Sequence, residues 1–277
     1  MTTVADVVAW VEKRFPPELA EEWDAPGLAV GHPAQPVAHV HFAVDPTLAV
    51  IREAIDAGAD LLITHHPLLL RGVTSVAADT VKGAAVHALV EGGCAQMAAH
   101  TNADAAATGV ADALAVALGV SVDGPLVPAP GHSSPVGGGR VGTIKPTSLT
   151  RFAAGVASAL PATAAGVLYA GDPDGIVATV AVLGGSGDGF LDDAAAAGVD
   201  AYVTADLRHH PASEAREAAM LRDGKPYLVS VSHFASESLW LAAAAAEVAS
   251  AFSVTTSVST LNTDPWTGRV PSSPFKE

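Results

Sequence analysis

Two segments of the chain are so alike that they constrain the fold more than any other feature of the sequence. Residues 58–64 read GADLLIT, and residues 198–204 read GVDAYVT. Each segment follows an Ala-rich stretch typical of a helix, ends in Thr, and is soon followed by His. Any strand–helix–strand unit has a glycine after its helix, so chance explains part of the likeness. Because a further helix and strand follow each segment, we favour a duplicated structural unit over chance.

Short apolar runs alternate with helical patterns along the chain. Such alternation implies an α/β fold with largely parallel sheets and right-handed crossovers. A stretch rich in Pro, Gly and Ser at 121–150 separates the two similar parts. We therefore predict one α/β half at 1–130 and a second at 131–277, packed as one compact unit. The predicted strands are 39–44, 60–64, 95–99, 177–183, 200–204 and 227–231, and the predicted helices are 3–15, 47–57, 80–91, 109–118, 148–159, 189–197 and a run after 239.

The composition narrows the classes of partner and location. The 277 residues carry a formal net charge of −15, so a phosphate backbone would find few Lys or Arg side chains, and nucleic acid is an unlikely partner. We expect no signal peptide and no membrane helix, because Gly, Asp and Glu interrupt every apolar run. The single cysteine, Cys94, excludes an intrachain disulfide and agrees with a cytoplasmic location. We interpret it as a buried thiol in a strand.

Five side chains of types that bind metals follow predicted strands. Ligands collect at the carboxyl ends of parallel strands, so these side chains can converge although they are far apart in the sequence. We predict a site between the two halves, because the residues divide between them. The predicted metal ligands are His65, His66, Asp104, His233 and Glu237.

Each of these residues also has an interpretation without a metal. His65 and His66 could cap a strand as inert, hydrogen-bonded imidazoles. Asp104 could form a helix N-cap or an Asx turn. Glu237 could be a first-turn carboxylate favoured by the helix dipole, although a helix from His233 would place both side chains on one face.

The donor set as a whole indicates the kind of metal. Imidazole and carboxylate suit zinc, manganese, iron or nickel, and no thiolate lies nearby to form a cysteine site. Five ligands exceed one tetrahedral shell. They fit two divalent metal ions per chain that share a carboxylate.

Several motifs resemble the Nif-three-like dinuclear metal-centre proteins, often labelled GTP cyclohydrolase I type 2 homologues. The resemblance covers nearly the whole chain in order. It implies that His66 and Asp104 bind one metal, that His65 and His233 bind the other, and that Glu237 bridges both. It also implies a homo-oligomer, a toroidal hexamer. The motifs are WDAPGLAVG (23–31), AVDPT (43–47), GADLLITHHPLL (58–69), AHTNADAA (99–106), GGGRVG (137–142), GGSGDG (184–189), VDAYVTADLRHH (199–210) and SHFASE (232–237).

Three positions depart from the family pattern without removing a ligand. The family usually has Asn at Ala25, Gly at Ala205 and Gly at Ser232. Ala25 removes a polar group from the rim of the cleft. The middle segment is also too short for the extra central domain of longer members.

Further residues beside the motifs could support the site. A ligating His usually donates its other N–H to a carboxylate or carbonyl, and Asp45 fits that role as well as it fits a helix cap. GGSGDG is interpreted as a tight strand-to-helix turn or, less favoured, as a phosphate cradle. The tail at 260–266 is expected to pack near the cleft or an interface. The other supporting candidates are Asp206, His100 and His210.

Two functions remain open from the sequence. The first is a metal-dependent hydrolase in which Glu237 is also catalytic and shuttles a proton. The resemblance implies GTP, a small-molecule nucleotide, as its substrate. The second is a non-catalytic metal-binding or regulatory protein, because metal ligands alone do not define a reaction.

Overall fold

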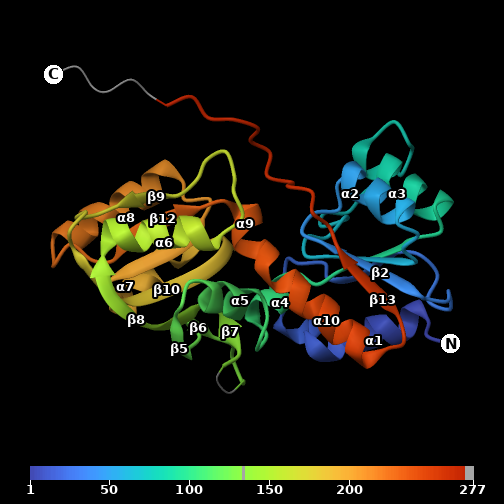
Figure 1. Ribbon diagram of the computed structural model, residues 1–277, viewed down its shortest axis with the longest axis horizontal. Coiled ribbons are helices and arrows are strands. Elements are labelled where there is room, and N and C mark those ends of the chain that lie inside the picture. Colours follow the sequence, from blue (N-terminus) through green and yellow to red (C-terminus); the bar gives the residue numbers. More distant parts are fainter. Residues whose placement is uncertain (133–134, 272–277) are drawn as a thin grey trace.

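The computed structural model describes residues 1–132 and 135–271, which form two β-sheets side by side with helices packed on both. The first sheet, on the right of Figure 1, has the strand order β1-β4-β3-β2-β13. Only its β1–β4 pair is antiparallel. Its strands are β1 (Gly27–Val30), β2 (His39–Ala43), β3 (Leu61–Thr64), β4 (Ala95–Ala98) and β13 (Thr255–Val258).

The apolar strands of the first sheet are covered by helices on both faces. The strand β3 reads LLIT and is buried along its whole length, as expected for a strand between two helical layers. Two apolar clusters lie on its opposite faces, one with α2 and α3 and one with α1 and α10. These helices are α1 (Val4–Arg14), α2 (Leu48–Asp56), α3 (Val81–Glu91) and α10 (Leu241–Ala251).

The second sheet has the order β5-β8-β10-β11-β12-β9, with a parallel centre of β10, β11 and β12 and antiparallel strands outside it. Helices α5 and α6 cover one face, and α7 and α8 contribute to the cluster on the other. Its strands are β5 (Ser121–Gly124), β8 (Arg140–Ser148), β9 (Leu168–Ala170), β10 (Ile176–Ser186), β11 (Ala201–Ala205) and β12 (Tyr227–Val231), and its helices are α5 (Val110–Ala117), α6 (Leu149–Ala159), α7 (Leu191–Ala196) and α8 (His209–Met220).

Short elements connect these layers. The strands β6 (Val127–Pro128) and β7 (Gly137–Gly138) form a separate two-stranded ribbon. In each half, one five-residue helix follows the third parallel strand. The helix α4 (Thr101–Ala105) follows β4, and α9 (His233–Glu237) follows β12. The 3-10 turns are η1 (Pro17–Leu19), η2 (Asp188–Phe190) and η3 (Ser238–Trp240).

The two halves repeat the same hydrogen-bonding pattern where their sequences are alike. Asp60 Oδ2 accepts hydrogen bonds of 2.7 and 3.0 Å from two successive backbone N–H groups of the neighbouring strand. Asp200 Oδ2 accepts the equivalent bonds at 2.7 and 2.9 Å. Gly58 and Gly198 both have positive φ angles, +70° and +68°, which favour glycine. These matched details support a structural duplication, and the predicted α/β class is confirmed.

Segments cross the predicted boundary at residue 130 in both directions. The strand β13 pairs with β2 of the first sheet, and α10 packs in the first sheet's core. Conversely, α5 and β5 precede residue 130 but belong with the second sheet. β13 reads TTSV, whose β-branched Thr and Val suit a strand, but it is too short and too polar to stand out as an apolar run.

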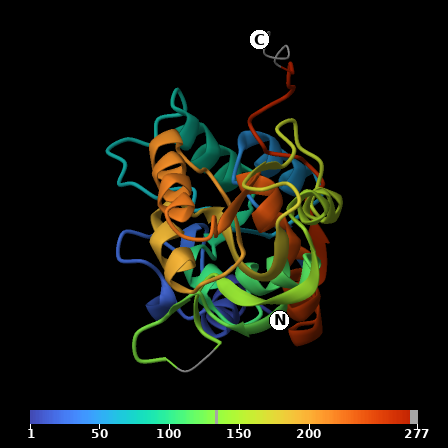
Figure 2. The ribbon, with the colours of Figure 1, turned by 90° about the vertical axis from the view of Figure 1, so that its left-hand side faces the viewer.

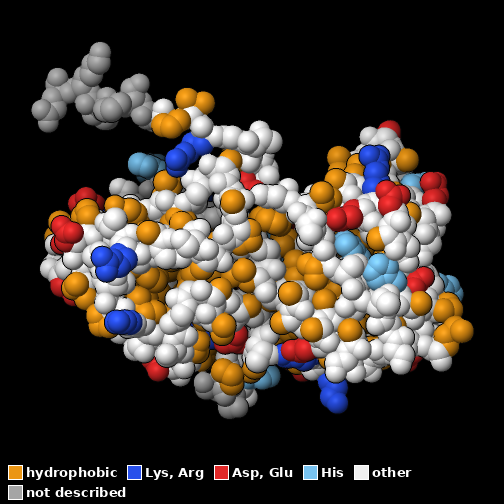
Figure 3. Space-filling view, in the orientation of Figure 1, with side chains coloured by type: hydrophobic (Ala, Val, Ile, Leu, Met, Phe, Trp, Pro, Cys, Tyr) orange, Lys and Arg blue, Asp and Glu red, His pale blue; other side chains and the backbone are white. Residues whose placement is uncertain are grey.

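The C-terminal segment after β13, red in the ribbons, runs from the first sheet across to the second half (Figures 1 and 2). The space-filling view shows a hollow between the two halves beside this segment (Figure 3). Among the helices of the described ranges, none is long and apolar enough to span a membrane.

Candidate metal centre

The carboxyl ends of the parallel strands bring the five predicted ligands together. His65 and His66 directly follow β3, and Asp104 lies on α4, which follows β4. His233 and Glu237 lie at the two ends of α9, which follows β12. Because both parallel groups end toward the middle of the molecule, the five side chains meet between the halves.

Each of the three histidines directs Nε2 into the centre. A hydrogen-bond acceptor faces the Nδ1 atom of every ring, so Nδ1 donates its proton there, and Nε2 becomes available to a metal once that nitrogen is deprotonated. This is the arrangement usual for histidines that ligate a metal through Nε2. The acceptors are Ala99 O at 2.9 Å from His65, Asp45 Oδ1 at 2.7 Å from His66, and Asp206 Oδ2 at 2.7 Å from His233.

Glu237 occupies the middle of the cluster and is only 3% exposed. Its Oε1 lies 3.4 Å from His65 Nε2 and 3.0 Å from His233 Nε2. Its Oε2 lies 3.0 Å from His66 Nε2. Asp104 Oδ1 lies 3.7 Å from His65 Nε2. The two carboxylate oxygens therefore face different histidines, as a carboxylate shared by two metals would.

Unsatisfied polar atoms concentrate at this centre. Five buried side-chain atoms of the described residues lack a hydrogen-bond partner. Three of them are His65 Nε2, Asp104 Oδ1 and Glu237 Oε2. Moreover, the Nε2 atoms of His66 and His233 lie only 3.1 Å apart. Buried polar atoms are normally paired, so the donor set fits bound cations better than an apo protein.

The charges of the cluster perturb one another strongly. Burial disfavours the ionised form of Glu237, but the surrounding histidines hold its pKa well below the usual value. Burial likewise disfavours the imidazolium of His66, yet its hydrogen bond to Asp45 and its ion pair with Glu237 raise its pKa to about 10. Burial raises the pKa of Asp104 to about 6. Without a metal, the centre thus holds protons that metal ligation would have to displace.

A fourth histidine, His100, joins the centre from the N-terminus of α4. Its ring centroid lies 5.2 Å from that of His65 and 5.4 Å from that of His66, and the three could share a metal. Its Nδ1 lies 2.7 Å from Asp24 Oδ1, so this ring also leaves Nε2 free. Burial opposes ionisation of Asp24, but hydrogen bonds from His100 and Thr101 lower its pKa to about 2.

Of the other residues predicted to support the site, two aspartates contact its histidines and one histidine does not. Asp45 and Asp206 each bind the Nδ1 side of a ligand histidine, as anticipated. Asp45 is not the helix cap, because Thr47 Oγ1 caps α2 by accepting from Val50 N. His210 lies on α8 with its ring against His209, away from the centre. Its proximity in sequence was therefore misleading.

The glycine-rich stretch 184–189 runs from the end of β10 through Gly187 into η2, as the favoured interpretation of a tight strand-to-helix turn predicts. Gly185 has φ +70°, and its backbone N–H donates to Ser236 Oγ at 3.0 Å. A Cβ atom there would lie 2.2 Å from Glu237 Oε1 and 3.3 Å from His233 Nε2. Glycine is needed because the strand passes directly beside the ligands.

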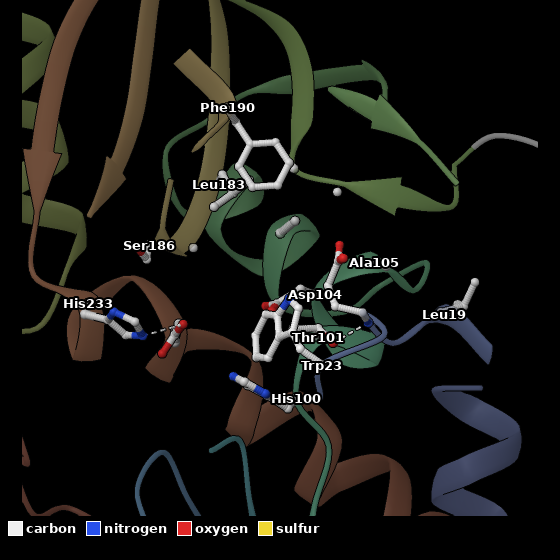
Figure 4. A pocket seen from close by; sticks show the side chains of 16 residues that line it. Leu19, Trp23, His100, Thr101, Asp104, Ala105, Leu183, Ser186, Phe190 and His233 are labelled. Carbon is white, nitrogen blue, oxygen red and sulfur yellow. Dashed lines mark hydrogen bonds and ion pairs between the residues drawn. The ribbon is translucent and has the colours of Figure 1, made fainter. Parts of the chain in front are cut away.

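Two openings reach the centre from different sides. One cavity of about 340 Å³ reaches Asp104, His233 and Glu237 and is shown in Figure 4. A second cavity of about 490 Å³ reaches His66 and His233 and is lined by the C-terminal segment.

The C-terminal segment packs beside the second opening, in agreement with the expectation that the tail at 260–266 lies near the cleft. Thr263 donates a short hydrogen bond to Asp45, which itself orients His66. Ser232, one of the family departures, caps α9 and donates to Asp264 Oδ2 at 2.5 Å. Ala205 is buried at the end of β11, and Ala25 is exposed beside Asp24.

Known proteins resemble the chain over its full length. The family model Duf34/NIF3 (NGG1p interacting factor 3) matches residues 2–265. A relative from Streptomyces coelicolor, named GTP cyclohydrolase 1 type 2 homolog, is 47% identical, with 99% of this chain and 97% of the relative covered. A relative of the same name from Mycobacterium tuberculosis is 36% identical, with 95% and 96% covered.

Solved structures show the same fold. A hypothetical protein from Staphylococcus aureus matches with a TM-score of 0.85 and 27% identity, with 95% of this chain and 98% of that chain covered. A Bacillus cereus protein related to NIF3 matches with a TM-score of 0.84 and 24% identity, with 96% and 98% covered.

Proposed function

Since the chain belongs to the Duf34/NIF3 family, we propose that it binds two divalent metal ions between its halves and acts as a metal-dependent hydrolase. The observation that carries this proposal is the convergence of three histidine Nε2 atoms on two carboxylates, with one atom each of His65, Asp104 and Glu237 buried without a hydrogen-bond partner. Imidazole and carboxylate donors suit zinc, manganese, iron or nickel. Cys94 takes no part, because it lies in another core and burial raises its pKa to about 12.

The positions of the Glu237 oxygens support one division of the ligands. Oε1 faces His65 and His233, whereas Oε2 faces His66. As the family resemblance implies, His65 and His233 would hold one ion, His66 and Asp104 would hold the other, and Glu237 would be shared by both. The nearest histidine nitrogen to Asp104 Oδ1 is His65 Nε2, at 3.7 Å. Two such ions would polarise a carbonyl, ring carbon or phosphoryl group and supply hydroxide at neutral pH.

The remaining chemistry belongs to side chains beside the ions. Glu237 contacts the histidines of both predicted ligand sets and so fixes their positions relative to each other. His100 accepts or delivers a proton at its free Nε2, because Asp24 fixes the proton on Nδ1. His100 also borders the 340 Å³ cavity, where a substrate would meet it. His100 is therefore a stronger candidate for proton transfer than Glu237, which is enclosed by ligands.

Metal analysis of the purified chain, followed by a substrate screen with each bound metal, tests this function. We expect about two metals per chain, and metal-dependent hydrolysis that disappears in His66→Ala without loss of fold. The screen includes GTP, because two relatives carry a name that refers to it. A metal count near zero after purification without chelators would refute the centre. Two bound metals with no turnover would instead support the non-catalytic alternative.

We further propose that the chain assembles as a toroidal hexamer in the cytoplasm. The family resemblance supports the assembly, and the single buried Cys94 agrees with a reducing compartment. Light scattering after size exclusion should give about six times the chain mass of 27.7 kDa. A mass of one chain would contradict the hexamer without affecting the metal centre.

A further inference from the structure

The 340 Å³ cavity has aromatic side chains on opposite walls. Figure 4 shows Phe190, from the second half, on one side and Trp23, from the first half, on the other beside His100. The Trp23 side chain is 59% exposed, and its ring meets His100 edge-on at 5.9 Å. Burying a half-exposed indole would release water from a large apolar surface, so this wall favours an apolar or aromatic ligand.

Other residues of the cavity lining carry small or apolar side chains. They include Gly138, Gly139, Leu183 and Ala105. The cavity volume suits a small molecule. Two aromatic walls with small, apolar residues beside them favour an aromatic ring as the ligand.

The described lining of the cavity includes His100 and His233 but offers no guanidinium or ammonium group to a phosphate. Among its described lining residues there is no Lys or Arg, while Glu21, Asp104 and Glu237 contribute carboxylates. The nearby Arg140 is fully buried and fully used, since it forms a double ion pair with Asp112 and donates to three backbone carbonyls. Recognition of a phosphate by proteins usually requires such free guanidinium or ammonium groups.

Metal loading would not make the centre strongly cationic. Five carboxylates lie in the centre or against its histidines, so two divalent ions would leave no positive excess. The chain also carries a formal net charge of −15. A polyanion would gain little attraction here. The five are Asp24, Asp45, Asp104, Asp206 and Glu237.

From this geometry we infer that the cavity binds an uncharged, planar aromatic or heteroaromatic ring between Trp23 and Phe190. The ring edge that reaches the metal centre faces Glu237 and His100. No Lys or Arg of the described lining is available to bind phosphate groups on the ligand. The inference rests on the proposed function, because it names the substrate class of that same centre.

Titration calorimetry on the metal-loaded full chain tests this ligand class with matched probes. The neutral probes are guanosine, quinazolin-4-one and indole, and GTP is the charged partner of guanosine. We expect the wild-type protein to bind at least one neutral probe and to bind GTP no more tightly than guanosine. Trp23→Ala and Phe190→Ala should each weaken neutral-probe binding about tenfold, the effect of losing one stacking surface.

Trp266→Ala is the matched control, because Trp266 is 68% exposed and lines the other cavity. It should change the affinity less than twofold. Metal content and thermal unfolding of each variant show whether the centre and fold are intact. Absent binding of all neutral probes, equal effects of the three variants, or tenfold tighter binding of GTP would each overturn the inference. None of these outcomes alters the metal count, on which the proposed function depends.

Discussion

The two halves share a framework but place different side chains at its strand ends. Thr64 and Thr204 occupy equivalent positions, since each follows the same glycine and aspartate in the repeated segment. The next two residues are His65 and His66 in the first half, whereas the second half has Ala205 and Asp206. The first half supplies ligands at this position, and Asp206 instead orients a ligand, His233.

The third parallel strand of each half retains a common pattern. Both are followed by a five-residue helix, α4 or α9, that ends in or next to a carboxylate directed at the centre. Asp104 is 27% exposed at its side chain, but Glu237 is 3% exposed because α9 packs against β10 and β11. The comparison indicates that the repeated framework sets where the cluster lies, while the two halves differ in how deeply they bury the carboxylate that they place there.

The largest expected difference between Glu237 and Asp104 is in the metal content of their variants. Glu237→Gln removes the oxygen charge that both ligand sets share, so we expect nearly all metal to be lost. Asp104→Asn should retain about one metal per chain. Elemental analysis of the folded variants measures the difference. Glu247→Gln, which alters only a surface pair with Arg14, serves as control. Equal losses in the two site variants would contradict a bridge from the second half.

The metal-free chain should lose stability as pH rises. Burial opposes protonation, but hydrogen bonds to Glu237 and an aspartate raise the pKa of His66 to about 10 and of His233 to about 9. Both lie above the ordinary 6.5, so the stabilisation is complete below pH 6.5 and disappears as pH passes the folded values. We expect a loss of roughly 3 kcal/mol, less than two independent shifts would give because both depend on Glu237.

Chemical denaturation of metal-free, chelator-treated protein from about pH 6 to about pH 10.5 measures this trend, because this range includes the ordinary and the raised pKa values. His66→Asn should flatten it more than His233→Asn, since His66 has the larger shift. Metal-loaded protein should show a weaker dependence, because ligation keeps both rings deprotonated. An unchanged slope in both variants would exclude these histidines as its source.

Alanine substitution at two glycines with positive φ separates the stability cost of backbone strain from the cost of a collision in the site. Gly58 and Gly185 both have φ +70°, but a Cβ at Gly58 meets nothing within 4 Å, whereas one at Gly185 meets Glu237. We expect Gly58→Ala to cost about 1 kcal/mol from backbone strain. Gly185→Ala should cost about 2 kcal/mol more from the collision and should also weaken metal binding. Denaturation midpoints and metal content together measure both effects, and equal effects would show that β10 can move away.

The smallest effect compares the equivalent aspartates of the duplicated segments. Asp60→Ala and Asp200→Ala each remove an acceptor of two backbone N–H groups, which should cost about 1 to 2 kcal/mol. Asp200 also pairs with Lys225 at 2.5 Å, so its variant should lose a few tenths of a kcal/mol more. Urea denaturation resolves this order. A negligible effect at one position would show that the duplicated network is used in one half only.

The sequence by itself determined the α/β class, the repeated segment and the convergence of five side chains. Strand ends are readable because apolar runs stop at Pro or polar residues, as at His65 and His66, and parallel strands end at the same edge. It also identified Asp45 and Asp206 as supports, since a histidine ligand requires an acceptor for its second nitrogen.

Only the tertiary structure decided how the two halves share the chain and which neighbours reach the centre. β13 joins the first sheet through backbone hydrogen bonds to β2, which any sequence can form. Glycine is needed at position 185 because Glu237 lies against it, and the ring of His100 is oriented by Asp24. Both partners lie far away in the sequence. His210, adjacent to the motif, lies outside the centre. Local pattern records which residues end a strand, but distances between distant segments depend on the packing of the whole chain.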